Sequence, residues 1–220
     1  MTKYTFRNFL EKKVHWLPTS FADDYKLVSK VLETGCLSLG PEQKLLILNS
    51  PNNPISHVYN IQELKRIAEV CDRQNVITIF DSIYGHPKDY DGHEYKTLAH
   101  ICPHRTLLTG GLSKVFSGGG WRLGFLAVPS ELDPKGDLKR SLSFLMSETI
   151  SGVNVPLQFA AARAYQGGDE IEKYLEVTKN IFTLATRYLW QRLTVMGLNC
   201  SKPQGGFYVF PNFKPYRDLL

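Results

Sequence analysis

Lys114 lies in a glycine-rich stretch whose residue types could carry out imine chemistry. Residues 110–124 read Gly-Gly-Leu-Ser-Lys-Val-Phe-Ser-Gly-Gly-Gly-Trp-Arg-Leu-Gly. A lysine amine can form a Schiff base with an aldehyde, and Ser113 and Arg122 could bind a phosphate group on the same molecule. On spacing alone, however, a solvated basic loop is the simpler interpretation of this stretch.

Two upstream segments place further polar residues where strands are expected to end. The apolar residues 45–48 are followed by Asn-Ser-Pro-Asn-Asn-Pro, and the apolar residues 76–80 are followed by Asp-Ser-Ile-Tyr. Ligands of open α/β sheets bind at the carboxyl ends of the strands. These polar residues are therefore better site candidates than the same residue types scattered over helices.

Three motifs in this chain resemble a known family in their order and spacing. They are S-P-N-N-P at residues 50–54, D-x-x-Y at 81–84 and S-K-x-x-x-x-x-G-W-R-L-G at 113–124. Each motif alone is weak, but the three together, each at the end of an apolar run, are hard to produce by chance. From about residue 17 onward the chain resembles the class I and II aminotransferases, which are pyridoxal-phosphate enzymes of fold type I.

The resemblance implies that pyridoxal 5'-phosphate is bound covalently by Lys114. This lysine would hold the cofactor as an aldimine and, once displaced by a substrate amine, would act as the catalytic base. Asp81 would lie beside the pyridine nitrogen, because a nearby carboxylate favours the protonated form of that nitrogen. The alternative for Asp81 is an ordinary surface aspartate that follows a strand.

The resemblance also assigns the remaining cofactor contacts. Tyr84 and Asn53 would donate hydrogen bonds to the phenolic oxygen of the ring, whereas Ser113 and Arg122 would bind the phosphate. A guanidinium suits this role because its planar fork can meet two phosphate oxygens at once. The simpler alternatives are a packed aromatic ring for Tyr84 and a turn residue before a proline for Asn53.

The resemblance implies amino-group transfer between an amino acid and a 2-oxo acid, with ping-pong kinetics. It also implies that the protein is a homodimer and acts in amino acid metabolism. Two alternatives remain open. One is another fold type I enzyme, such as a carbon-sulfur lyase or an aminocyclopropane-carboxylate synthase. The other is a truncated relative that is not catalytic.

Departures from the family pattern set limits on this interpretation. Ile55 and Ser56 replace the usual Thr-Gly, and Gly110 and Gly111 stand where members commonly carry a further phosphate-binding hydroxyl. Segments that the family places before the matched region are not visible, and the context of Arg217 does not match the family's substrate-binding arginine. We therefore expect a central fragment with a weaker phosphate site.

Alternating strand and helix patterns predict an α/β fold with a mostly parallel sheet and helices on both faces. We expect residues 1–170 to form a partial large cofactor-binding domain, and residues 171–220 to form an interdomain helix and the beginning of a small α+β domain. The expected strands are 45–49, 76–81, 106–109, 123–128 and 205–210. The expected helices run from Asp23 or Asp24 to Gly35, from Asn60 onward and from 169 to about 196.

Composition agrees with a soluble enzyme. The chain has 220 residues, 43% hydrophobic and 21% charged, with a net charge of +5 that suits an anionic cofactor. It has no apolar run long enough to span a membrane, no secretory signal and no nucleic-acid-reading motif, so we expect a cytoplasmic protein without membrane or nucleic-acid partners. Its four cysteines lack paired spacing and are expected to be reduced thiols.

One further cluster contains residue types that bind metals. Five potential ligands occur within nineteen residues, interleaved with glycine and proline: His86, His93, His100, Cys102 and His104. Zinc sites favour more compact pairs of ligands than this spacing offers. The sequence therefore favours a solvated loop, and no metal ligand is assigned.

Overall fold

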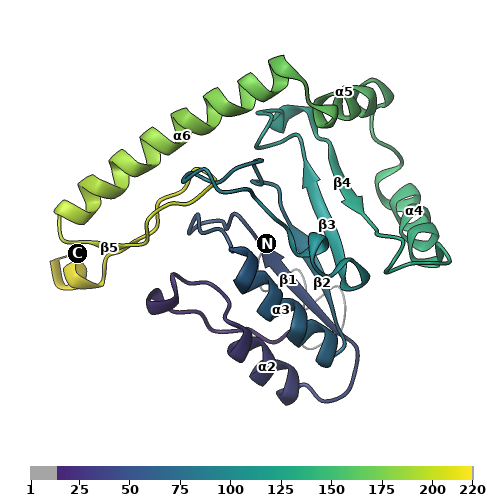
Figure 1. The fold of residues 1–220 in the computed structure, drawn as a ribbon, viewed down its shortest axis with the longest axis horizontal. Helices are drawn as coiled ribbons and strands as arrows, with labels where there is room; N and C mark the ends of the chain where they lie inside the picture. Colours follow the sequence, from purple (N-terminus) through teal and green to yellow (C-terminus); the bar gives the residue numbers. More distant parts are fainter. Residues whose placement is uncertain (1–13, 220) are drawn as a thin grey trace.

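The computed structural model describes residues 14–219, which form a four-stranded sheet, a separate two-stranded sheet and helices around them (Figure 1). The N-terminal segment on which the cytoplasmic expectation partly rests, residues 1–13, lies outside this range. The α-helices are α2 (Ser29–Ser38), α3 (Ile61–Arg73), α4 (Asp137–Ile150), α5 (Val155–Gln166) and α6 (Asp169–Val195). The strands are β1 (Lys44–Asn49), β2 (Val76–Asp81), β3 (Thr106–Gly111), β4 (Gly124–Ala127), β5 (Asn199–Cys200) and β6 (Pro211–Asn212). Short 3-10 helices are η1 (Phe21–Asp23), η2 (Leu98–His100), η3 (Pro103–Arg105), η4 (Gly119–Trp121) and η5 (Lys214–Leu219).

The main sheet has the strand order β1-β2-β3-β4, and its first three strands are parallel. β4 pairs antiparallel with β3. In the parallel register Asn49 lies opposite Asp81, and Asp81 lies opposite Thr109. The predicted α/β fold with a mostly parallel sheet is thus confirmed, and the carboxyl ends of three strands meet at one edge.

The hydrophobic core lies between this sheet and the helices α2 and α3. Alternate residues of β1 and β2 point into it, among them Leu48 and Phe80, and they meet the apolar face of α3, which includes Leu64 and Ile67. Helix α5 packs instead against the end of the sheet, where the Tyr165 ring meets Phe125 of β4 edge to face and its hydroxyl donates to the Gly111 carbonyl.

Helix α3 begins as its sequence predicts. The Asn60 side chain accepts hydrogen bonds from the amides of Gln62 and Glu63, and the Glu63 carboxylate accepts one from the Asn60 amide. These reciprocal bonds satisfy amides that the first turn of a helix leaves unpaired. Ile61, the first residue of the helix, is 41% exposed, whereas Leu64 and Ile67 are buried.

Helix α2 differs from its predicted bounds at both ends. Asp24 has a left-handed backbone (φ +51°) and closes η1, so the helix starts only at Ser29. Gly35 does not end the helix but lies inside it. A Cβ there would lie 2.4 Å from Leu17 Cδ2, so this glycine is explained by close packing and not by a helix stop.

The segment 205–210, predicted as a strand, forms a turn and a loop, and the strand β6 begins one residue later. Its backbone groups are used elsewhere: the amides of Gln204 and Gly205 donate to the Ser56 carbonyl, and the amide of Tyr208 donates to Ser56 Oγ. These bonds tie the segment to the loop after β1 and leave it no ladder partner.

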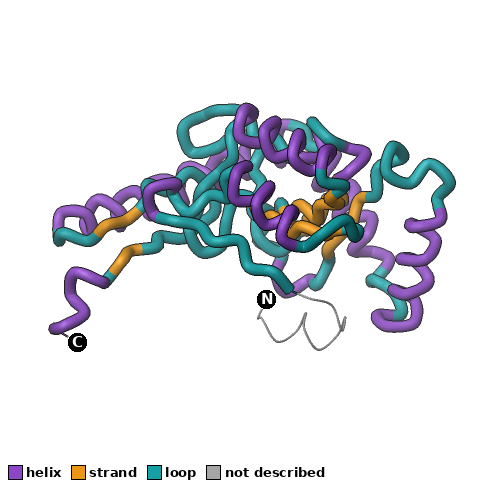
Figure 2. The backbone as a smooth tube through the Cα atoms, turned by 90° about the horizontal axis from the view of Figure 1, so that it is seen from below, coloured by secondary structure: helices purple, strands orange, loops and turns teal. Residues whose placement is uncertain are grey.

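Helix α6 confirms the predicted long helix, and Figure 1 shows it crossing from α5 to the β5 end of the molecule. Much of its apolar stripe is exposed, including Ile181 (57%) and Tyr188 (65%). Figure 2 places the β5–β6 pair at the far end of the molecule from the main sheet. Among residues 14–219, no helix is both long and apolar enough to cross a bilayer.

The capping box gives a test of how the fold is stabilised. Replacing Asn60 by alanine leaves two amides of α3 without an acceptor, so Asn60→Ala should lower the free energy of unfolding by about 1 kcal/mol. Urea denaturation measures the loss. Gln62→Ala is the matched control, because this neighbouring side chain is exposed and only its backbone amide takes part. Equal stability of the two variants would contradict the role of the cap.

Candidate active site

The Asp81 carboxylate is held at the carboxyl edge of the sheet by donors from three strand ends. Its Oδ2 accepts from Asn49 Nδ2 at 3.3 Å, and its Oδ1 accepts from the Ile83 amide and from Thr109 Oγ1, each at 3.2 Å. Asn49 Nδ2 also donates to the Asp81 carbonyl at 3.0 Å. The carboxylate therefore has a fixed orientation set by β1, β2 and β3 together.

Tyr84 is the centre of a second polar group at the same edge. Asn53 Nδ2 donates to Tyr84 Oη at 3.2 Å, and the hydroxyls of Tyr84 and Tyr208 are 2.7 Å apart. Burial, then the hydrogen bond with Tyr208, raises the pKa of Tyr84 to about 12, and the charge of Asp81 adds to the rise. The Tyr84 phenol is therefore protonated at neutral pH and can serve as a donor.

The amine of Lys114 reaches this group from the loop after β3. Lys114 Nζ lies 5.9 Å from the centroid of the Tyr84 ring and 5.7 Å from that of Phe207. All three residues line one pocket, whose wall also includes Tyr95 and Lys179. A cation over aromatic faces at this range is attracted by the ring quadrupole, which favours an amine held at the pocket wall.

Three of the expected site residues lie around Tyr84: Asn53 donates to its hydroxyl, the Lys114 amine lies over its ring, and the charge of Asp81 acts on its phenol. Ser113 and Arg122 belong to the same loop as Lys114, and the loop is closed by a bond from the Leu112 amide to the Leu123 carbonyl. Ser113 is half-buried, whereas the Arg122 guanidinium is exposed and donates to the Gly119 carbonyl at 2.7 Å. The expected phosphate ligands thus lie on the loop that carries the lysine, and Arg122 is hydrogen-bonded within that loop.

Packing explains the two glycines that stand where a phosphate-binding hydroxyl was expected. A Cβ on Gly110 would lie 2.5 Å from Phe125 Cζ, and a Cβ on Gly111 would lie 2.7 Å from the Leu123 carbonyl oxygen. Both contacts are shorter than side chains tolerate. Gly111 is therefore required by the backbone of Leu123 and Gly124, whereas a side chain at position 110 would have to displace the Phe125 ring.

Three aromatic residues of the site were not predicted from the sequence. Tyr208 bonds to Tyr84 and Phe207 lies under the Lys114 amine, but the segment that carries them was interpreted as a small-domain strand. Tyr95 also lines the pocket, with its hydroxyl donated to the Ser50 carbonyl, and burial raises the pKa of its phenol. The only signal in the sequence was the pair of aromatics after two glycines at 205–206.

Comparison with known proteins identifies the family. The family model described as "Aminotransferase class I and II" matches residues 14–220. The chain belongs to the class I and II aminotransferases. The aspartate aminotransferase of Geobacillus stearothermophilus is 33% identical over 179 residues, which cover 80% of this chain and 43% of the relative. The aromatic-amino-acid aminotransferase 2 of Thermococcus litoralis is 31% identical, over 90% of this chain and 49% of the relative.

Solved structures of the family have the same fold. The aromatic aminotransferase of Pyrococcus horikoshii OT3 superposes with a TM-score of 0.76 at 31% identity, over 89% of this chain and 50% of that one. The aspartate aminotransferase of Thermus thermophilus with maleate gives 0.77 at 25% identity, over 90% and 49%. These neighbours confirm pyridoxal-phosphate fold type I. The chain spans about half the length of the relatives it matches.

The Tyr84–Tyr208 contact predicts a measurable titration. Removing the Tyr208 hydroxyl takes away a hydrogen bond and a negative neighbour that both raise the pKa of Tyr84, so Tyr208→Phe should lower that pKa below about 12. Carbon-13 NMR of ring-labelled tyrosine, with the Tyr84 signal assigned by Tyr84→Phe, follows the titration. Tyr188→Phe, at an exposed position, is the control, and an unchanged or higher Tyr84 pKa in Tyr208→Phe would contradict the assignment.

Proposed function

We propose that this chain supplies the covalent and electronic part of a pyridoxal-phosphate-dependent aminotransferase site. The observation that carries the proposal is the meeting of an amine, a donor-held carboxylate and a protonated phenol at one edge of a parallel sheet. These groups come from Lys114, Asp81 and Tyr84. Edges of this kind, outside the carboxyl ends of strands, are where α/β proteins bind ligands.

The residues present fit the chemistry of pyridoxal 5'-phosphate. Its aldehyde suits the Lys114 amine, its pyridine nitrogen suits the Asp81 carboxylate, and its phenolic oxygen suits the donors Tyr84 and Asn53. The oriented carboxylate supports this match, because the bonds from Asn49 and Thr109 direct it without cancelling its charge.

The loop that follows β3 is the part of the chain that we expect to bind the phosphate of the cofactor. We propose Ser113 and Arg122 as its ligands, since both belong to the loop that carries Lys114. The exposed Arg122 guanidinium already donates to one carbonyl oxygen, that of Gly119. It would have to exchange this bond for a phosphate oxygen. The two glycines before the loop add no hydroxyl of their own.

When bound, the cofactor supplies an electron sink for negative charge that develops on the substrate α-carbon. The chain's own residues do the rest. Asp81 holds a proton on the pyridine nitrogen, and Tyr84, protonated at neutral pH, donates to the phenolic oxygen. Lys114 Nζ would take the proton from the substrate α-carbon and would return it to the carbon of the cofactor's aldehyde group, which is general base and then general acid catalysis.

The wider assignment follows from the family. We propose an amino acid donor and a 2-oxo acid acceptor, which react in turn in a ping-pong sequence. We further propose that the protein is a cytoplasmic homodimer that acts in amino acid metabolism. The net charge of +5 supports anionic ligands. We also propose that residues 1–170 are a partial large domain and that 171–220 lead into a small domain, which the separate β5–β6 sheet supports.

The covalent role of Lys114 can be tested directly. Titration with pyridoxal 5'-phosphate should produce an imine absorption band, and borohydride reduction followed by mass mapping should place the label on Lys114. Lys114→Ala should lose the band and the label. Lys179→Ala is the matched control, because this lysine also lines the pocket. Labelling of wild type at another lysine, with Lys114 unmodified, would contradict the proposal.

Product analysis separates transfer from the two alternatives. With an amino acid and a 2-oxo acid together, an aminotransferase should form a new amino acid in amounts equal to the donor consumed. A carbon-sulfur lyase or a cyclopropane-forming synthase would instead release its product without any acceptor. A cofactor band that does not respond to amino acids would show the non-catalytic relative.

A further inference from the structure

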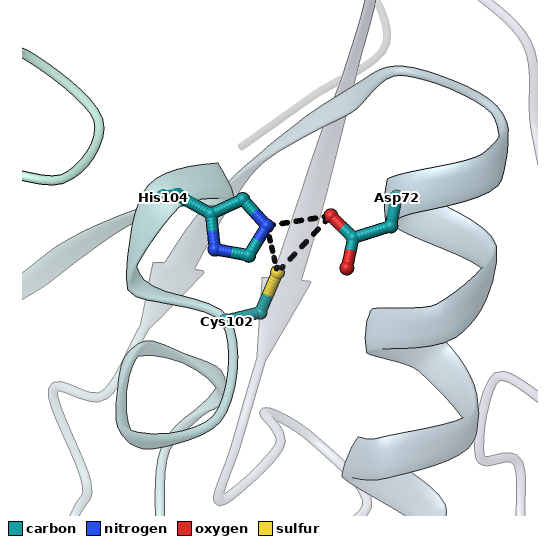
Figure 3. Close-up of side chains that lie close together, drawn as sticks. All are labelled: Asp72, Cys102 and His104. Carbon is teal, nitrogen blue, oxygen red and sulfur yellow. Dashed lines mark hydrogen bonds and ion pairs between the residues drawn. The ribbon is translucent and has the colours of Figure 1, made fainter.

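A cluster of three metal-binding side chains lies away from the candidate active site. Asp72 comes from the last turn of α3, whereas Cys102 and His104 flank the start of η3, just before β3. Figure 3 shows the three side chains pointing toward one another. Because α3 leads into β2 and η3 leads into β3, the cluster lies at the amino ends of these strands, opposite the edge that carries Lys114.

The donor atoms of this cluster are close enough to share one cation. Cys102 Sγ lies 3.7 Å from His104 Nε2 and 3.8 Å from Asp72 Oδ1, and the last two atoms are 2.7 Å apart. A point equidistant from all three lies about 2.0 Å from each, close to the zinc-ligand distances of roughly 2.0–2.3 Å for oxygen, nitrogen and sulfur. Small movements of the three side chains would bring their donor atoms to binding distance of a cation just above the plane of these atoms.

The residue types select among cations. A thiolate with an imidazole and a carboxylate suits Zn²⁺, whereas Ca²⁺ and Mg²⁺ prefer oxygen ligands alone. Cys102 is 1% exposed, while Asp72 and His104 are exposed, so the site is anchored in the core and open to solvent on one side. Solvent gives the ion a path in and can supply water as a further ligand.

Only part of the cluster seen in the sequence takes part. His86 Nε2 is bonded to the Leu175 carbonyl, and His100 Nδ1 to Thr97, so these rings are engaged elsewhere. The fold replaces them with Asp72, thirty residues before Cys102. This explains why the ligand spacing in the sequence did not indicate a metal site.

We propose that Asp72, Cys102 and His104 form a binding site for one Zn²⁺ ion, with water in the fourth position. The ion would join the end of α3 to the segment before β3. The competing explanation is an ion-pair cluster without metal, because His104 bonds to Asp72 directly and Arg105 Nε lies 3.5 Å from the same Asp72 oxygen. Arg105 lowers the affinity expected of the site, because its charge repels a cation.

Binding requires loss of the thiol proton. A cysteine binds zinc as the thiolate, so the metal must displace the proton of the Cys102 thiol to bind. Zn²⁺ affinity should therefore increase with pH across the range from 6 to 8, and binding should release protons. Isothermal titration calorimetry in buffers of different ionisation enthalpy measures this release.

Cobalt(II) is the probe that identifies the ligands in the chelator-treated full chain. One equivalent should produce a thiolate-to-cobalt charge-transfer band, which excess Zn²⁺ should abolish. His104→Gln and Asp72→Asn should each weaken cobalt binding at least about tenfold, in line with losses known for disturbed metal sites. Both positions are exposed, so these variants test the site without altering the core. Cys102→Ser should remove the band.

The test includes two control variants and a result that would contradict the proposal. Cys200→Ser and His93→Gln change the same residue types outside the cluster and should leave the band and the affinity unchanged. Absence of a thiolate band in wild type, or affinity equal to wild type in both His104→Gln and Asp72→Asn, would overturn the proposal in favour of a metal-free ion-pair cluster. The readout needs neither the cofactor nor turnover, so it is independent of the proposed aminotransferase function.

Discussion

Parallel pairing of β1, β2 and β3 is the constraint on which the candidate site depends. The register that puts Asn49 opposite Asp81 and Asp81 opposite Thr109 lets side chains of β1 and β3 donate to the carboxylate at the end of β2. Because side chains alternate between the faces of a strand, a slip of one residue would turn Asp81 to the other face and remove these donors. The burial of alternate residues of β1 and β2 against α3 fixes that register, so the core positions the chemistry.

The second half of the site depends on contacts that are long in sequence. The segment 204–208 docks on the loop after β1 through Ser56, and a Cβ on Gly205 would meet Pro51 Cγ at 2.8 Å. This docking brings the Tyr208 hydroxyl to Tyr84, 124 residues earlier in the chain. The aromatic wall around the lysine is thus a consequence of one loop packing on another.

This division explains what the sequence could and could not predict. The ends of β1 and β2 and the start of α3 depend on local patterns, and the structure has them where they were expected. Tyr208 and the Asp72 cluster depend on pairs of segments brought together by the fold, for which a single sequence carries no periodic signal. The prediction that Gly35 ends the helix was wrong, because this glycine allows Leu17 to pack closely against the helix.

The central claim is that Lys114 binds the cofactor covalently and that the Asp81 carboxylate faces the ring nitrogen of the cofactor. A crystal structure of the chain after incubation with pyridoxal 5'-phosphate measures this most directly. We predict continuous electron density from Lys114 Nζ into the cofactor, with the pyridine nitrogen facing the Asp81 carboxylate and the phenolic oxygen facing Tyr84. Density attached to another lysine, or a ring nitrogen turned away from Asp81, would contradict it.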